Sequence, residues 1–228
     1  AQVTAQPDAD LHAIALAASG TTGADLANIV NEAALHAVKM GYAAVMQEDL
    51  MEAVEVVIAG KEKKDRVLNP RERRLVAFHE VGHALVSAKQ KQAQPVQKIT
   101  IIPRTMGSLG YTLSVPEEDR YLLTREELLG EITTLLGGRA AELVEFGDSS
   151  TGAANDIGRA PAIARKMVTQ YGMSEKFGPM GLESSENQYL DGRNVATCSE
   201  QTGSAVDEEV RSIIERCQQA AVTLLEKN

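Results

Sequence analysis

Apolar residues recur every three or four positions along most of the chain, which is the spacing of one face of an α-helix. At the start of the chain this pattern predicts three helices, over residues 11–18, 21–39 and 47–59. Thr22 is a candidate cap for the second helix, and Gly41 is a candidate stop. The three together predict a small helical unit.

A charged segment follows this unit. Residues 60–66 read Gly-Lys-Glu-Lys-Lys-Asp-Arg, without an apolar side chain, and Pro70 then begins a new helical pattern. Such a shift in composition is typical of a domain boundary. We therefore predict two domains, residues 1–62 and 63–228, which a chain of 228 residues is long enough to form.

The second domain is predicted to contain further helices and one pair of strands. The helical patterns cover residues 71–90, 124–144, 155–171 and 204–226. Thr124 begins the second of these with a capping pattern, since Glu127 follows three residues later. Residues 98–103 and 110–115 are short and rich in β-branched and aromatic residues, as strands are. The predicted fold class is therefore mainly α with a small β-sheet.

Pro161 lies inside the predicted helix 155–171. An interior proline loses a backbone hydrogen bond and clashes with the preceding turn, at a cost of about 3 kcal/mol. We therefore expect this helix either to kink at Pro161 or to begin later than residue 155.

Composition narrows the classes of function. Hydrophobic residues make up 43% of the chain and charged residues 24%, which is ordinary for a globular protein. A net charge of −9 argues against a nucleic-acid partner, because binding to a phosphate backbone depends on clustered Lys and Arg. The sequence has neither a run of about 18 apolar residues nor a signal-peptide pattern, so the chain as given is expected to be soluble.

The strongest chemical signal is His79-Glu80-Val81-Gly82-His83, which matches the pattern His-Glu-x-x-His. On a helix, residues four apart lie on the same face, so both imidazoles can bind one zinc ion while Glu80 lies beside them. Zinc lowers the pKa of water towards 7, and a carboxylate can then take the proton as water attacks a peptide carbonyl. The pattern predicts His79 and His83 as ligands of one Zn²⁺ per chain and Glu80 as the catalytic base.

A tetrahedral catalytic zinc needs a third protein ligand and one open position. Both remaining histidines belong to the N-terminal helical unit, so the third ligand is expected to be a carboxylate or Cys198. Glu142 and Glu145 are the candidates if the site uses a Glu on the next long helix. Asp156 is the alternative, near the start of the following helix, where the helix dipole favours an ionised carboxylate. Spacing alone does not choose between them.

Three stretches resemble the FtsH family of membrane-anchored AAA ATP-dependent zinc metalloproteases. Residues 78–84, Phe-His-Glu-Val-Gly-His-Ala, look like the family's zinc helix. Residues 136–142, Leu-Gly-Gly-Arg-Ala-Ala-Glu, are similar to its next helical block, and residues 150–157, Ser-Thr-Gly-Ala-Ala-Asn-Asp-Ile, to the segment that supplies its third ligand. The resemblance implies that Asp156 completes the zinc site of an FtsH-type zinc-peptidase domain.

Residues 99–103 and 107–112 are similar to the strand and edge-strand region of the same family. There an unpaired strand edge can take up an extended peptide by strand addition. The resemblance implies that Gly107, Leu109, Gly110 and Tyr111 bind polypeptide substrates in this way.

The first domain resembles the helical lid of an AAA ATPase module, especially at Gly23-Ala-Asp-Leu and Asn31-Glu-Ala-Ala. The resemblance implies that Gly23 and Ala24 lie near a bound nucleotide. The phosphate-binding pattern Gly-x-x-x-x-Gly-Lys-Ser/Thr does not occur in the sequence, so ATP and Mg²⁺ are expected only in the intact parent protein.

As a whole, the resemblance implies the proteolytic portion of a protease that degrades unfolded or membrane-extracted proteins in protein quality control. It also implies a homo-hexamer, anchored in a membrane through segments that precede Ala1, with this part on the cytoplasmic, matrix or stromal side. Two other classes remain open, a catalytically silent scaffold or chaperone subunit and a nucleotide-responsive assembly module. The intact Glu80 and both histidines disfavour the first, and the missing phosphate loop disfavours the second.

Overall fold

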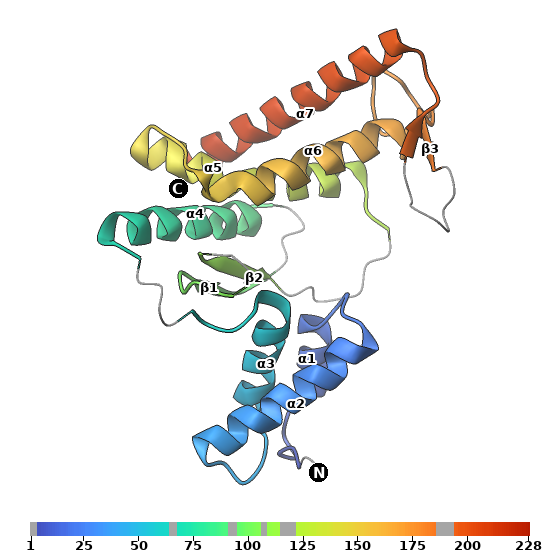
Figure 1. Ribbon diagram of the computed structural model, residues 1–228. Coiled ribbons are helices and arrows are strands. Elements are labelled where there is room, and N and C mark those ends of the chain that lie inside the picture. Colours follow the sequence, from blue (N-terminus) through green and yellow to red (C-terminus); the bar gives the residue numbers. More distant parts are fainter. Residues whose placement is uncertain (1–3, 64–67, 91–94, 106–108, 115–121, 186–193) are drawn as a thin grey trace. The chain divides into compact units, whose positions relative to one another are not determined.

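The computed structural model describes residues 4–63, 68–90, 95–105, 109–114, 122–185 and 194–228 (Figure 1). The chain forms two compact units, one of residues 1–77 and 94–119 and one of residues 78–93 and 120–228. Helix α4 (Pro70–Ala88) contributes residues to both. Most elements are helices and the strands are short, which confirms the predicted mainly α fold with a small β-sheet. The domain boundary at residues 62 and 63 stays a prediction.

The first unit begins with helices α1 (Leu11–Ala17), α2 (Gly23–Met40) and α3 (Gln47–Ala59). Thr22 caps α2, because its hydroxyl accepts a bond from the backbone N–H of Asp25 and the Asp25 carboxylate accepts one from the backbone N–H of Thr22. Gly41 ends α2 with a φ of 78°, a left-handed conformation that glycine adopts without strain. Both terminal residues predicted for this helix are therefore confirmed. Buried side chains of the three helices form the core of this part, among them Ile14, Ile29, Ala33, Leu50, Ala53 and Val54.

The first unit also holds an antiparallel hairpin of β1 (Val96–Thr100) and β2 (Tyr111–Ser114). Thr100 lies opposite Tyr111. The strand predicted over residues 98–103 thus starts and ends earlier than expected, because residues 101–103 do not continue the ladder with β2.

A buried polar cluster attaches this hairpin to α3. The carboxylate of Glu55 on α3 accepts bonds from Lys98 Nζ at 2.7 Å, from Arg104 Nη2 at 2.7 Å and from the Tyr111 hydroxyl. Arg104 is 1% exposed and also donates to the Gly60 carbonyl at 3.2 Å. Because a buried carboxylate is costly unless it is paired, these donors fix the position of the hairpin on α3.

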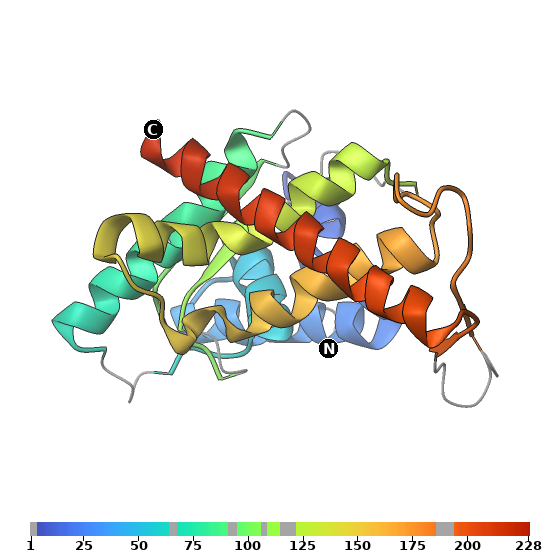
Figure 2. The same cartoon turned by 90° about the horizontal axis from the view of Figure 1, so that it is seen from above.

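The second unit is built around α5 (Arg125–Phe146), α6 (Ala154–Thr169) and α7 (Glu200–Glu226), which all contact one another. Figure 2 shows α7 crossing over α5 and α6. The predicted cap of α5 is confirmed, since Thr124 and Glu127 form a capping box. The core between the three helices consists of buried apolar side chains, among them Leu128, Ile132, Leu136, Ala164, Met167, Val168, Val206, Val210 and Ile213.

Three details of the second unit differ from the prediction. A short hairpin of β3 (Glu183–Ser185) and β4 (Asn194–Ala196) was not predicted, because its strands have three residues each. Helix α7 begins at residue 200 and not at residue 204, because Ser199 caps it through the backbone N–H of Thr202. Helix α6 begins at Ala154 and runs through Pro161, so the expected later start is wrong.

None of the helices in the described part of the chain combines the length and apolar character that a membrane span requires.

Candidate metal centre

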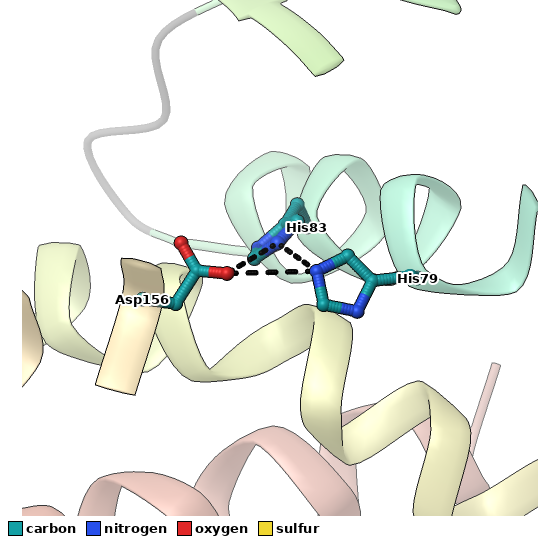
Figure 3. A group of neighbouring side chains, drawn as sticks. All are labelled: His79, His83 and Asp156. Carbon is teal, nitrogen blue, oxygen red and sulfur yellow. Dashed lines mark hydrogen bonds and ion pairs between the residues drawn. The ribbon is translucent and has the colours of Figure 1, made fainter. Parts of the chain in front are cut away.

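Helices α4 and α6 bring three predicted ligands together in the second unit. His79 and His83 lie one turn apart on α4, and Asp156 lies in the first turn of α6. The two Nε2 atoms are 3.1 Å apart, and Oδ2 of Asp156 lies 3.5 Å from Nε2 of His79 and 3.4 Å from Nε2 of His83. Figure 3 shows the three side chains pointing toward one another. Over the ranges that the structure describes, they form the group of His, Cys, Asp and Glu side chains that can hold a metal ion.

The spacing of the three atoms fits zinc. Zinc binds imidazole nitrogen and carboxylate oxygen at about 2.0–2.1 Å, so a tetrahedral site places its ligand atoms about 3.3–3.4 Å apart. The observed separations of 3.1, 3.4 and 3.5 Å agree with this value. Two nitrogens and one oxygen also form a donor set typical of catalytic zinc, in which three protein ligands leave the fourth position open.

The opposite nitrogen of each imidazole is held by α5. Nδ1 of His79 lies 2.6 Å from Oε1 of Glu142, and Nδ1 of His83 lies 2.8 Å from the carbonyl oxygen of Thr134. An ionised carboxylate and a backbone carbonyl only accept hydrogen bonds, so both Nδ1 atoms carry the proton. The lone pair of each Nε2 therefore faces the other two ligand atoms, as metal binding requires.

The electrostatics of the three side chains also favour a cation. Burial lowers the pKa of His79, but the hydrogen bonds to Asp156 and Glu142 and the charges of Glu142 and Glu80 outweigh it and raise the pKa. Burial raises the pKa of Asp156, whereas the hydrogen bonds to His79 and His83 lower it by more. Asp156 is therefore ionised at neutral pH, which is the form that binds a metal.

Glu80 follows His79 on α4 and is 7% exposed. Its charge contributes to the raised pKa of His79, the residue that precedes it on the same helix. A carboxylate beside the open position of a zinc site can accept a proton from water.

The alternatives for the third ligand take other positions in the second unit, and one of them bonds a predicted ligand from behind. Glu142 is fully buried and bonds His79 Nδ1, and its carboxylate also accepts from the backbone N–H and the hydroxyl of Ser150. Glu145 is exposed, and Cys198 packs against the core of α5, α6 and α7. None of these three belongs to the group of converging ligand atoms.

Sequence reasoning missed the residues that orient the histidines. Thr134 acts through its backbone carbonyl, which carries no sequence signal. The sequence pattern offers Glu142 only as a candidate ligand, and Ser150 only as part of a family motif. A usable signal was the pair Gly137-Gly138 inside α5, because each glycine in a helix interior costs about 1 kcal/mol relative to alanine and so indicates a need for space.

The other predicted binding residues belong to the first unit. Gly107 lies outside the described residues. Leu109 is half-buried, Gly110 is buried, and Tyr111 is half-buried with its hydroxyl on Glu55. Gly23 and Ala24 lie exposed in the first turn of α2.

Comparisons with known proteins identify the family of this chain. Residues 66–228 match the model of peptidase family M41, and residues 8–52 match that of the AAA+ lid domain. The chain is 56% identical to the ATP-dependent zinc metalloprotease FtsH of Clostridium perfringens over 97% of this chain and 31% of that protein. The identity is 51% to the protein of the same name from Lancefieldella parvula, over 99% of this chain and 35% of the relative. The identity to the ATP-dependent zinc metalloprotease FtsH of Thermotoga maritima is 47%, over 96% of this chain and 37% of that protein.

The chain thus spans about a third of the length of these relatives. The matches confirm the resemblance to the FtsH family that the three motifs indicate. Since the M41 match covers most of the chain and includes His79, Glu80, His83 and Asp156, the chain belongs to peptidase family M41.

Proposed function

We propose that this chain is the proteolytic portion of an ATP-dependent zinc protease and that it hydrolyses peptide bonds as an endopeptidase. The observation that carries the proposal is the convergence of His79 Nε2, His83 Nε2 and Asp156 Oδ2 at separations that suit zinc. Its relatives bear the name ATP-dependent zinc metalloprotease, which supports the same metal and reaction.

His79, His83 and Asp156 would hold the ion. When bound, zinc supplies the Lewis-acid chemistry that makes water a nucleophile near neutral pH. Glu142 and the Thr134 carbonyl keep both rings oriented, so the ligands do not have to reorganise when the metal enters.

Glu80 is the general base in this proposal. Its carboxylate takes a proton from the attacking water and later delivers it to the nitrogen of the leaving amine. The position of Glu80 directly after a ligand on α4, with its side chain buried near His79, supports this role.

We also propose that the hairpin binds polypeptide substrates through strand addition, with Gly107, Leu109, Gly110 and Tyr111 at the binding edge. Within the described part of the chain, β2 has β1 as a strand partner on one side. Strand addition would pair an extended peptide with the backbone of β2. Tyr111 is held by Glu55, which keeps the strand in place before a substrate arrives.

The remaining properties belong to the intact protein and are proposals on the strength of kinship. They are a homo-hexameric ring that encloses the active sites, membrane anchoring through other segments, and degradation of unfolded or membrane-extracted proteins for quality control. Closure of head-to-tail contacts into a ring would hide the active sites from folded bystanders. Gly23 and Ala24 would contact nucleotide there, with ATP and Mg²⁺ bound by the ATPase core.

The substitution Glu80→Gln tests the reaction. It removes the proton acceptor and leaves all three ligands in place, so the variant should retain one zinc ion per chain and lose casein cleavage. Zinc content by mass spectrometry and cleavage of labelled casein are measured on the same preparation, with Glu145→Gln as the exposed control on the neighbouring helix. Cleavage by Glu80→Gln at the rate of the control would refute the assignment.

A further inference from the structure

Three residues spaced four apart on α5, Thr134, Gly138 and Glu142, share one face of that helix. The imidazole of His83 is bonded to the first of them and the imidazole of His79 to the last. In an α-helix the carbonyl of residue 134 points toward residue 138. Both rings are therefore held against α5 one turn to either side of Gly138.

Gly138 has no room for a side chain. A methyl carbon added there would lie 2.5 Å from Nε2 of His79, 2.6 Å from its Cε1 and 2.6 Å from Nε2 of His83. Non-bonded heavy atoms prefer separations of about 3.5–4.0 Å. The smallest side chain would thus overlap the two atoms proposed to bind the metal.

Neither the rings nor the helix can easily move aside. The Nδ1 hydrogen bonds to Glu142 and the Thr134 carbonyl fix both rings. Helices α4 and α5 already touch through their backbones, since a methyl carbon on Gly82 would lie 2.6 Å from the Gly137 carbonyl oxygen. Turning either ring away would break its bond to α5, and shifting α5 would disrupt this close helix contact.

We infer that Gly138 is a positioning residue for the metal: its missing side chain is the space in which Nε2 of His79 and Nε2 of His83 converge. This inference rests on the proposed function, because it concerns the same zinc site. It assigns to Gly138 an effect on metal binding that is separate from the general packing of α5. Any side chain at this position separates the two nitrogens and excludes the metal, while the helix itself can still form.

The test is zinc affinity of Gly138→Ala, measured by competition with a chromogenic chelator, together with the visible absorption of the Co²⁺-substituted protein. We expect zinc affinity to fall at least about 100-fold, beyond the 10–100-fold that losing an outer hydrogen bond typically costs. The absorption of tetrahedral Co²⁺ should be lost, and far-UV circular dichroism should stay that of the wild type. Gly130→Ala is the matched control, because the added carbon lies on the same helix and its three nearest neighbours are side-chain atoms of Gln90, at 3.4 Å or more.

Wild-type zinc affinity and an unchanged Co²⁺ spectrum in folded Gly138→Ala would overturn the inference and leave the proposed function intact. If the wild-type protein itself took up no zinc, the proposed function would fail as well. Should Gly138→Ala not fold, the same substitution is made in a His79→Ala/His83→Ala background, where the methyl group meets no imidazole. Normal folding there supports the inference. Failure to fold there, when the same double variant folds with Gly138 intact, overturns it, because the obstruction would then not be the histidines.

Discussion

Nδ1 of His79 lies 2.6 Å from Oε1 of Glu142, although 63 residues separate the two in the chain. Glu142 is fully buried, and its carboxylate accepts two further bonds from the backbone N–H and the hydroxyl of Ser150. The pair thus forms a carboxylate–histidine unit that holds a proposed metal ligand in one tautomer and orientation.

Replacement of Glu142 by Gln should weaken zinc binding by about 10–100-fold, because the charge that supports His79 is lost while an acceptor oxygen remains. Isothermal titration of the metal-free protein with zinc measures the change. Glu145→Gln, an exposed change on the same helix, should bind zinc as the wild type does. Equal affinities in the two variants would show that Glu142 does not support the site.

Asp156→Asn should weaken zinc binding more than Glu142→Gln does, because it removes a charge in direct contact with the ion. The same titration, extended to both variants in one buffer, gives the order of affinities. The opposite order, with zinc retained by Asp156→Asn and lost from Glu142→Gln, would make Glu142 the third ligand.

Arg104→Met should destabilise the hairpin of the first unit by about 1.5–3 kcal/mol, because it removes one charged donor from buried Glu55, which keeps its bonds to Lys98 and Tyr111. Hydrogen exchange of the β1 and β2 amides, followed by mass spectrometry, reports this locally. Arg165→Met is the control, since it removes an arginine that is 44% exposed and whose surface ion pairs contribute about 0–1 kcal/mol. Similar exchange rates in both variants would mean that Arg104 does not hold the hairpin.

Tyr111 should make stability depend on alkaline pH. Burial, followed by the hydrogen bond to Glu55, raises the pKa of its phenol above the ordinary value of 10.0. A raised folded-state pKa contributes stability that is fully present below the unfolded-state pKa and is lost as the pH rises above it. The midpoint of urea unfolding should therefore fall more steeply above pH 10 in the wild type than in Tyr111→Phe. Tyr171→Phe, which changes a half-exposed tyrosine, should retain the wild-type slope.

Local patterns made much of this protein predictable. Five consecutive residues, from His79 to His83, are enough to predict that both imidazoles lie on one face of a helix with Glu80 between them in the sequence. One turn of sequence is likewise enough to predict the helix caps at Thr22 and Thr124. Asp156 did not follow from spacing, because its place beside the histidines depends on how α6 packs in the second unit. The family motif, and not the spacing, predicts it as the third ligand.

The hydrogen-bond partners of the two histidines could not be predicted from the sequence for a related reason. Glu142 had the right chemistry for a ligand, and only the docking of α4 against α5 shows which nitrogen it reaches. The β3–β4 hairpin was missed because strands of three residues give too short a pattern to recognise.

The proposed metal ligands His79, His83 and Asp156 come from α4 and from the start of α6, two segments far apart in the sequence. The unfolded chain cannot present the three atoms together, so an ion bound there would act as a reversible cross-link whose binding energy adds to the stability of the fold. Chelation should then lower the melting temperature and abolish catalysis in one event. A chain stripped of its metal would be both inactive and easier to unfold, so it would become a suitable substrate for proteases itself.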